Sequence, residues 1–317
     1  MEMTWSEHLQ GAEVHRDPFP HLIIDDFLPE VLLETAIRSF PDLALIGDLA
    51  SRSEDLPANA RASLDLATVH GCGDRRLEDL KAFYQVLQVE KLVRLLFARL
   101  RPFLEDPLDA EAEHLPFLPR MSLADRQNWL QGRPSLSFDI QPGINPPQFA
   151  GLEPHLDDKY ELFAGLLYIY PAEIPPVGGD LILYERRPDQ VFDGTRLKGN
   201  TYGAKPVKRI AYRHNRFVAL LNGNSALHGV TPYLESDNQL PRRLYNIIVE
   251  AYNLPYKSYD YWDLPRGNRI TNLKHAVKGA IMLLQHGLTK AVSPSKIMDQ
   301  LVHSTPGEVM DRWEFWA

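Results

Sequence analysis

The feature that most limits the fold is a run of short apolar segments in the second half of the chain. Apolar and polar side chains alternate over 135–140, where Pro142-Gly143 ends the run. Four more strand-like segments follow, at 163–170, 180–184, 217–221 and 244–252. Turn residues connect these segments and no helical pattern comes between them, which argues against βαβ units. The pattern predicts an antiparallel barrel or jelly roll.

Helical patterns flank this region. A short strand over 22–28 closes at Pro29, and Pro29-Glu30 opens a helix that stops before Pro41. Residues 75–104 carry leucines and aromatic residues at helical spacing and predict one further helix. We expect an α+β protein with a jelly-roll domain and supporting N-terminal helices over 1–262. A C-terminal helical extension over 263–317 would pack on the same domain.

Composition excludes several classes of protein. The 317 residues are 44% hydrophobic and 24% charged, and 34 Lys and Arg against 42 Asp and Glu give a net charge of -8. This balance does not favour a nucleic-acid partner. The lone Cys72 excludes an internal disulfide and suits a reducing compartment. The chain shows no signal-peptide pattern at its start and no integral membrane segment, so we expect a cytoplasmic protein.

Two histidines and one carboxylate carry the chemical signal. His155 and Asp157 are two residues apart, so an extended backbone turns both side chains to the same face. His228 follows another strand and a tight turn. A lone His-x-Asp pair is usually a surface feature, but here all three residues fall at strand ends, where a barrel brings side chains together. Two imidazoles and a carboxylate with open coordination positions are the ligand set of mononuclear non-heme Fe(II) oxygenases.

Catalytic zinc also uses two histidines and a carboxylate, so ligand type alone leaves a hydrolase open. A zinc hydrolase needs a general base near the bound water, and Asp158 is the immediate candidate. An arginine entering the last strand, Arg242 or Arg243, offers a partner for a dicarboxylic cosubstrate instead.

With these residues in order, the chain resembles the 2-oxoglutarate/Fe(II)-dependent oxygenases, in particular their prolyl-hydroxylase-like branch. The resemblance spans about residues 18–252, although 41–134 match only in helical character, and each motif alone is short. The matching motifs are Pro20–Leu28, His155-Leu156-Asp157, Leu166–Ile169, Gly178–Leu181, His228-Gly229-Val230 and Arg242-Arg243. The resemblance implies a double-stranded β-helix, with His155, Asp157 and His228 binding Fe(II).

The resemblance also implies that an arginine at the start of the last barrel strand binds the far carboxylate of 2-oxoglutarate. Arg242 and Arg243 point to opposite faces of that strand. Arg243 shares its face with Tyr245 and three aliphatic residues, which is typical of a barrel interior, so we choose Arg243. A one-residue register difference would exchange the two faces, so Arg242 stays open as the alternative.

Two tyrosines join the implied cosubstrate site. Tyr168 matches a family position whose hydroxyl often helps to hold the far carboxylate, and a buried core tyrosine is the competing interpretation. Tyr245 stands where many members have Ser or Thr, two residues after the arginine. The cosubstrate pocket is therefore expected to differ in detail from that of other members.

The implied reaction is oxidative decarboxylation of 2-oxoglutarate by O2, which gives succinate and CO2 and hydroxylates a substrate C–H bond. Related halogenases lack the carboxylate ligand, so Asp157 disfavours halogenation. Our preferred substrate is a small polar metabolite or sugar derivative. A prolyl-type protein side-chain hydroxylase is the first alternative. A cupin-like dioxygenase or a non-catalytic jelly-roll binding protein is the second.

Basic residues gather in two places outside these motifs. The connection 186–215 is rich in Lys and Arg, which suits an anionic or sugar-like substrate, although solvated loop charge explains it equally well. Residues 264–298 contain no acidic residue and include an amphipathic helix pattern over 271–287. Peripheral membrane contact is one use of such a helix. We weigh packing on the barrel at roughly three to one against it.

Overall fold

The computed structural model describes a large part of the 317-residue chain. The described residues are 3–49, 61–104, 115–120, 135–145, 149–158, 160–170, 177–187, 192–193, 196–197, 204–234 and 241–252. The expected C-terminal extension over 263–317, with its amphipathic helix over 271–287, lies outside the described residues. The proposed boundary between the two parts therefore stays a prediction.

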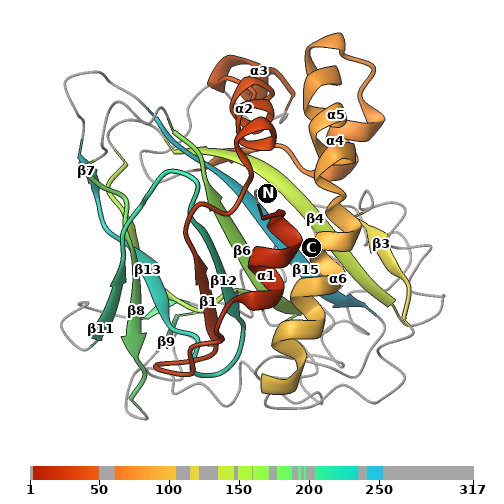
Figure 1. Cartoon of the computed structure of the whole chain (residues 1–317). Helices are drawn as coiled ribbons and strands as arrows, with labels where there is room; N and C mark the ends of the chain where they lie inside the picture. The colour runs from red at the N-terminus through yellow and green to blue at the C-terminus, as the bar shows by residue number, and fades with distance from the viewer. Residues whose placement is uncertain are drawn as a thin grey trace, which may run out of the picture.

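Two antiparallel sheets form the centre of the molecule (Figure 1). Sheet A contains seven strands: β1 (His21–Ile24), β2 (Ala62–Ser63), β3 (Phe117–Pro119), β4 (Ser135–Asn145), β6 (Glu161–Tyr168), β12 (Phe217–Leu221) and β15 (Arg242–Tyr252). Sheet B contains six: β5 (Leu152–His155), β8 (Leu181–Glu185), β9 (Phe192–Asp193), β10 (Arg196–Leu197), β11 (Lys205–Ile210) and β13 (His228–Val230). A short pair joins β7 (Val177–Gly178) to β14 (Tyr233–Leu234).

The strand order defines the architecture. Sheet A runs β1-β12-β6-β15-β4-β2, with β3 parallel on β4, and sheet B runs β11-β8-β13-β5-β10-β9. From β4 onwards the chain passes repeatedly from one sheet to the other: β4 in A, β5 in B, β6 in A, β8 and β11 in B, β12 in A, β13 in B and β15 in A. This winding of two antiparallel sheets is a double-stranded β-helix, so the expected α+β jelly-roll fold is confirmed.

The helices precede the barrel in sequence. They are α1 (Trp5–Gly11), α2 (Glu30–Arg38), α3 (Leu43–Leu49), α4 (Leu66–Gly71), α5 (Glu78–Leu87) and α6 (Val89–Leu100), with 3-10 turns η1 (Arg75–Leu77) and η2 (Arg101–Phe103). A capping box of Thr4 and Glu7 begins α1, and the Asp65 side chain caps α4. As expected, α2 begins directly after Pro29. No helix in the described part of the chain is long and apolar enough to cross a membrane.

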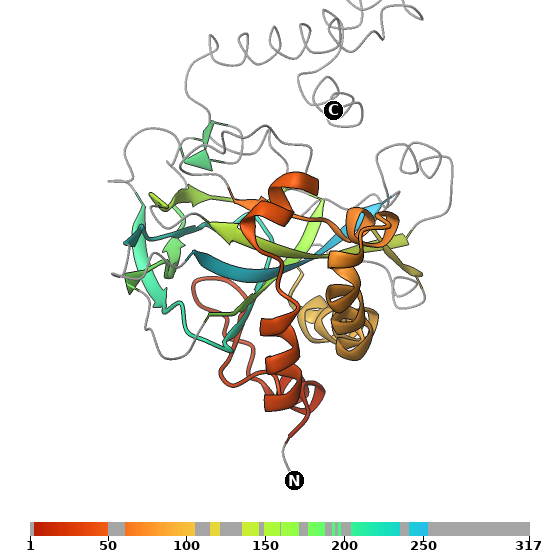
Figure 2. The ribbon, with the colours of Figure 1, turned by 90° about the horizontal axis from the view of Figure 1, so that it is seen from above.

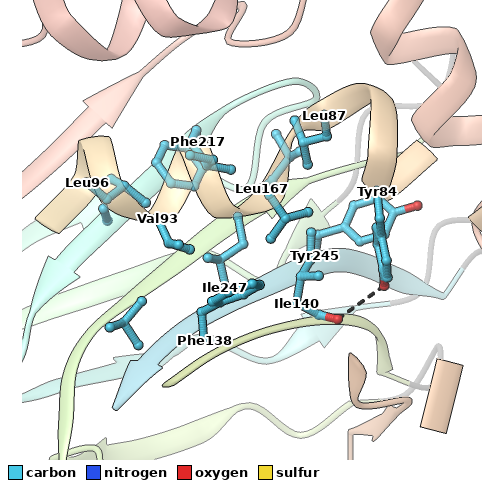
Figure 3. Close-up of a cluster of buried hydrophobic side chains, with 14 of the residues drawn as sticks. Tyr84, Leu87, Val93, Leu96, Phe138, Ile140, Leu167, Phe217, Tyr245 and Ile247 are labelled. Atoms are coloured by element: carbon cyan, nitrogen blue, oxygen red, sulfur yellow. Dashed lines mark hydrogen bonds between the residues drawn. The ribbon is translucent and has the colours of Figure 1, made fainter. Parts of the chain in front are cut away.

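Sheet A has two buried faces, which we call outer and inner. The outer face packs against α1, α2, α5 and α6, which lie together on one side of the sheet (Figure 2). Tyr84 of α5 donates a hydrogen bond of 3.1 Å to the carbonyl oxygen of Ile140 in β4 (Figure 3). Tyr245 and Ile247 of β15 belong to the same cluster and are fully buried. The inner face is turned towards sheet B.

The helix expected over 75–104 is in fact two helices. Gln88 adopts a left-handed backbone with φ of 55°, and its position separates α5 from α6. The apolar spacing continues across the break, with Leu87 and Val89 both buried, so periodicity alone does not reveal it.

The expected strand end at Pro142-Gly143 is also wrong, because β4 continues to Asn145. The carbonyl oxygen of Pro142 accepts a hydrogen bond from Leu64 next to β2, so the Pro142 nitrogen also points towards that short edge strand. The missing N–H therefore does not interrupt the β4–β15 ladder.

The connection over 186–215 contains a strand that the sequence analysis missed. β11 pairs with β8 at the edge of sheet B. It carries three cationic side chains, which are typical of an edge strand but conceal its β character in the sequence. Lys205 forms an ion pair with Glu185, and Arg209 one with Asp180. These charges have structural partners on the surface of sheet B.

Candidate metal centre and cosubstrate pocket

A cavity of about 600 Å³ opens between the inner face of sheet A and sheet B. Its wall includes His155, Asp157 and His228 at one side and Arg242 of β15. Other strand residues on the wall are Gln141, Asn145, Ala164, Leu166, Leu181, Leu244, Asn246 and Ile248. This volume lies in the usual range of small-molecule sites.

The three candidate ligands meet in this cavity. β5 and β13 pair so that His155 lies directly opposite His228, and their ring centroids are 4.4 Å apart. Asp157 follows β5, and its Oδ1 lies 3.8 Å from Nε2 of His155 and 3.6 Å from Nε2 of His228. One ligand atom from each residue lies within 4.8 Å of the others. The three residues therefore lie close together, as the sequence predicts.

Hydrogen bonds fix the orientation of both imidazoles. Nδ1 of His155 donates to the carbonyl oxygen of Glu153, and Nδ1 of His228 donates to that of Ala226, both at 2.9 Å. In the neutral ring this tautomer leaves Nε2 as the ligand atom. Both Nε2 atoms are turned towards Asp157. Backbone carbonyl partners of this kind are typical of metal-binding histidines.

Backbone packing holds the two histidine strands together. A Cβ on Gly229 would lie 2.7 Å from the carbonyl oxygen of Leu152 in β5, so any side chain there would push β5 and His155 away from β13. Asn222 ties the loop after Asp157 to the same end of the barrel. Its Nδ2 donates to the carbonyl oxygens of Asp158 at 2.7 Å and Glu161 at 3.1 Å.

Arg242 is the cavity-lining arginine of β15 and is only 3% exposed. Its Nε donates to the carbonyl oxygen of Gly179, and one terminal nitrogen donates to Oδ1 of Asn145, both at 3.1 Å. The guanidinium carbon lies 5.3 Å from the ring centre of Tyr168 and 5.0 Å from that of Tyr212. Two aromatic rings and two hydrogen bonds therefore fix the position of this cation.

The hydroxyl of Tyr168 lies in the same region. Tyr168 is fully buried, and its hydroxyl has no hydrogen-bond partner among the described residues. Burial raises the pKa of Tyr168, and the nearby Arg242 opposes that rise. Burial likewise raises the pKa of Tyr212, whose hydroxyl bridges the backbone N–H and carbonyl of Arg243. A buried hydroxyl beside a buried guanidinium is suited to a carboxylate.

Arg243 and Tyr245 do not lie in the cavity, and this part of the sequence analysis is wrong. Arg243 is on the outer face, with its guanidinium carbon 5.8 Å from the ring centre of Phe40. Tyr245 points among the helices, as Figure 3 shows, and donates to the carbonyl oxygen of Ala36. The more apolar face of β15 is buried by helices, whereas the mixed face with Arg242 lines the cavity.

Several residues that line or support the cavity were not identified from the sequence. Asn145 and Tyr212 support Arg242, and Asn222 supports the Asp157 loop. A partial signal for Asn145 is present, because Asp139 and Gln141 are polar at every second position of β4, although Gly143 interrupts the pattern before Asn145. Tyr212 and Asn222 lie in loops between strands, where periodicity carries no information.

Asp158 does not supply the base that a zinc hydrolase would need. Its side chain is exposed and accepts a hydrogen bond of 2.9 Å from the backbone N–H of Tyr160. It is absent from the described cavity wall. This position does not support a hydrolase.

Comparison with known proteins gives structural similarity without sequence similarity. No family model matches the sequence, and no curated protein sequence matches it. Three of the similar solved structures are prolyl hydroxylases. The Phytophthora capsici prolyl 4-hydroxylase has 15% identity and a TM-score of 0.41, with 79% of this chain and 64% of that chain covered.

The prolyl hydroxylase of Trichoplax adhaerens, in complex with a hypoxia inducible factor peptide, has 14% identity and a TM-score of 0.43. The match covers 80% of this chain and 94% of that one. The Pseudomonas putida prolyl-4-hydroxylase has 13% identity and a TM-score of 0.41, with 79% and 100% covered. At such identities and scores, none of these similarities assigns an activity, which has to be inferred from the site itself.

Proposed function

We propose that this chain is a 2-oxoglutarate- and Fe(II)-dependent oxygenase, with His155, Asp157 and His228 as the iron ligands. The main support is the pairing of two groups in one cavity. Three ligand atoms lie within 4.8 Å of one another, and the buried Arg242 lines the same cavity beside Tyr168, whose hydroxyl is unpartnered among the described residues. Metal binding alone would not account for the buried arginine and the tyrosine hydroxyl.

Each residue of the proposed site has a separate task. His155 and His228 present Nε2 atoms, because their Nδ1–H groups are engaged by carbonyl oxygens. Asp157 would add a single carboxylate to the two imidazoles, and this set of three protein ligands is the one that mononuclear Fe(II) oxygenases use. When bound, Fe(II) would supply the O2 chemistry. Arg242 would bind the far carboxylate of 2-oxoglutarate in place of Arg243, and Tyr168 would assist it as expected, whereas Tyr245 would have no part in the site.

We further propose a small polar metabolite or sugar derivative as the molecule that is hydroxylated. The cavity volume of about 600 Å³ suits such a substrate together with the cosubstrate. A protein side chain is the competing substrate. It is tested by including proline-containing peptides among the candidates.

The decisive experiment measures binding before turnover. The full chain is loaded with Fe(II) without O2, and bound iron and 2-oxoglutarate affinity are determined by metal analysis and calorimetry. We expect one iron per chain and a visible charge-transfer band on addition of 2-oxoglutarate. Asp157→Ala and His228→Ala should each lower the affinity for iron at least tenfold. After O2 is admitted, 2-oxoglutarate should be converted to succinate.

The matched control is His70→Ala, which removes a histidine from α4 outside the cavity wall and should leave iron binding unchanged. Iron-loaded protein that fails to bind 2-oxoglutarate would contradict the oxygenase assignment. Binding of iron and O2-dependent substrate oxidation without any 2-oxo acid would favour a cupin-like dioxygenase.

A further inference from the structure

The cavity has a second polar region, formed by the segment that leads into α4 together with residues of β4, of β15 and of the turn after β3. Its residues are Arg61, Ser63, Asp65, Thr68, Arg120, Gln141 and Asn246. None of these residues is needed for the proposed iron and 2-oxoglutarate sites. A region lined with so many polar groups is expected to bind a polar molecule.

Arg61 is held in this region by the fold. The adjoining strand β2 pairs with β4, where Ala62 lies opposite Ile144 and Ser63 opposite Gly143. The aliphatic stem of Arg61 lies over Gly143, since a Cβ there would come within 2.8 Å of Cδ of the arginine. The missing side chain at Gly143 thus makes room for Arg61 above the inner face of sheet A.

The guanidinium of Arg61 has no hydrogen bond or ion pair with any of the residues described. Asp157, Glu161 and Asp139 attract it, but burial and repulsion by Arg242 lower its pKa. Arg120 on the same wall differs, because it pairs with Asp139 at 3.2 Å and Glu250 at 3.7 Å. A buried guanidinium whose five N–H donors bond to none of the described residues is suited to an oxyanion.

Asn246 gives an independent indication of a ligand. It is only 5% exposed, lies opposite Gln141 in the β4–β15 ladder and lines the cavity. Its carboxamide forms no hydrogen bond within the described part of the chain. Buried polar groups normally have partners, so an amide that faces a cavity without one is suited to a polar group of a ligand.

We propose that Arg61 and Asn246 form the substrate subsite of this cavity. Arg61 pairs with an oxyanion group of the substrate, a carboxylate or a phosphate, and Asn246 hydrogen-bonds a neighbouring polar group. This proposal rests on the proposed oxygenase function, since it assigns the substrate side of the same cavity. It narrows the substrate to a small anionic molecule.

The test uses simple anions and needs no knowledge of the substrate. The full chain, saturated with Mn(II) and 2-oxoglutarate without O2, is titrated with acetate, inorganic phosphate or neutral acetamide at constant ionic strength. The melting temperature is recorded by scanning fluorimetry. We expect saturable stabilisation by an anion and none by acetamide. The anion that saturates at the lower concentration distinguishes carboxylate from phosphate.

Variants assign the effect to Arg61. Arg61→Gln should weaken the apparent anion affinity about tenfold or more, while 2-oxoglutarate affinity stays within about twofold. Gly143→Ala keeps the positive charge but displaces the arginine stem, and should weaken anion binding similarly. Arg38→Gln removes an exposed arginine at the end of α2 and is the matched control. Circular dichroism establishes that each variant is folded.

Three outcomes would overturn the proposal: no saturable anion effect in the wild type, an equal effect in Arg61→Gln, or loss of 2-oxoglutarate binding in Arg61→Gln. The last outcome would assign Arg61 to the cosubstrate site. Failure of the wild type to bind Mn(II) and 2-oxoglutarate would instead reject the oxygenase function. The two failures are therefore distinguished within one set of samples.

Discussion

The two faces of β15 differ in chemistry although both are buried. The outer face presents Arg243, Tyr245, Ile247, Val249 and Ala251 to the helices. The inner face presents Arg242, Leu244, Asn246, Ile248 and Glu250 towards the cavity side. Ile247 is 0% exposed and Asn246 only 5%, so burial alone does not distinguish the faces. The difference lies in polarity.

Polarity differs because the two faces meet different partners. The outer face meets apolar helix surfaces, where an unpaired polar group would be costly. The inner face meets a cavity, where polar groups are satisfied when a ligand binds. A buried strand face that mixes polar and apolar residues is therefore the better candidate for a binding site.

Substitution of the outer-face residue Ile247 should affect folding most. Ile247→Ala removes a fully buried side chain from the helix-packed core, and we expect a loss of about 4 kcal/mol in the free energy of unfolding. Ile248→Ala on the inner face should cost about 2 kcal/mol, the lower end of the range for a buried isoleucine, because its side chain borders the cavity. Urea denaturation of both variants measures the difference. Equal losses would mean that the two faces are energetically alike.

Substitution of the two neighbouring arginines should have different effects on 2-oxoglutarate binding. Arg242→Met removes a charged hydrogen-bonding partner from the cavity, and 2-oxoglutarate affinity should fall about 100-fold, near 3 kcal/mol. Arg243→Met keeps a long side chain beside Phe40 and should leave that affinity within about twofold. Calorimetry on the Mn(II)-loaded proteins gives both values. The opposite ranking would restore the original choice of Arg243.

This pair of arginines also shows what the sequence can and cannot predict. Strand alternation correctly predicts that Arg242 and Arg243 point to opposite faces, because alternation depends only on neighbouring residues. Which face meets the cavity depends on the helices that pack from elsewhere in the chain. Choosing the more apolar face as the interior failed, because the strand is buried on both sides. The three candidate ligands were found, because His155 and Asp157 form a local motif and His228 follows a recognisable turn.

Other misses have the same physical origin. Gln88 interrupts a helix without a break in apolar spacing, and β11 is an edge strand whose exposed cationic residues conceal it. The place of Arg61 depends on the pairing of β2 with β4, which are far apart in sequence. Short-range patterns thus predicted the strands and the metal motif. Long-range pairing decided the rest of the cavity.

The inner face also contains a polar contact away from the cavity, and this contact should affect stability but not cosubstrate binding. His21 of β1 is fully buried, donates from Nδ1 to Phe19 and accepts from Lys208 of β11 through Nε2. Burial lowers the pKa of His21 to about 4, against 6.5 in the unfolded chain. Its contribution is therefore complete above pH 6.5 and is lost as the pH falls towards 4.

Allowing for solvent screening, we expect this loss to be on the order of 2 kcal/mol in the free energy of unfolding. Urea denaturation at several pH values measures it. His21→Gln keeps a polar side chain but does not titrate, so its pH dependence over this range should be weaker. An unchanged pH slope in this variant would assign the effect to other groups.

Two buried asparagines provide the finest comparison. Asn222 bonds the carbonyl oxygens of Asp158 and Glu161 on the metal side, whereas Asn215 bonds the N–H and carbonyl of Leu28 before α2. Asn222→Ala should release the loop that positions Asp157 and weaken iron affinity about tenfold. Asn215→Ala should instead lower the free energy of unfolding by about 1 kcal/mol, with iron affinity unchanged.

Metal titration measures the iron affinity of both variants, and urea denaturation measures their free energy of unfolding. Loss of iron affinity in Asn222→Ala alone would show that Asn222 positions Asp157, because a merely structural role would lower stability without moving the metal affinity. If both variants lose stability and both keep iron, the Asp157 loop does not depend on this hydrogen bond. In that case the hydrogen bonds from His155 and His228 to backbone carbonyl oxygens would be enough to keep the metal ligands in place. Asn222 would then contribute to packing and not to metal binding.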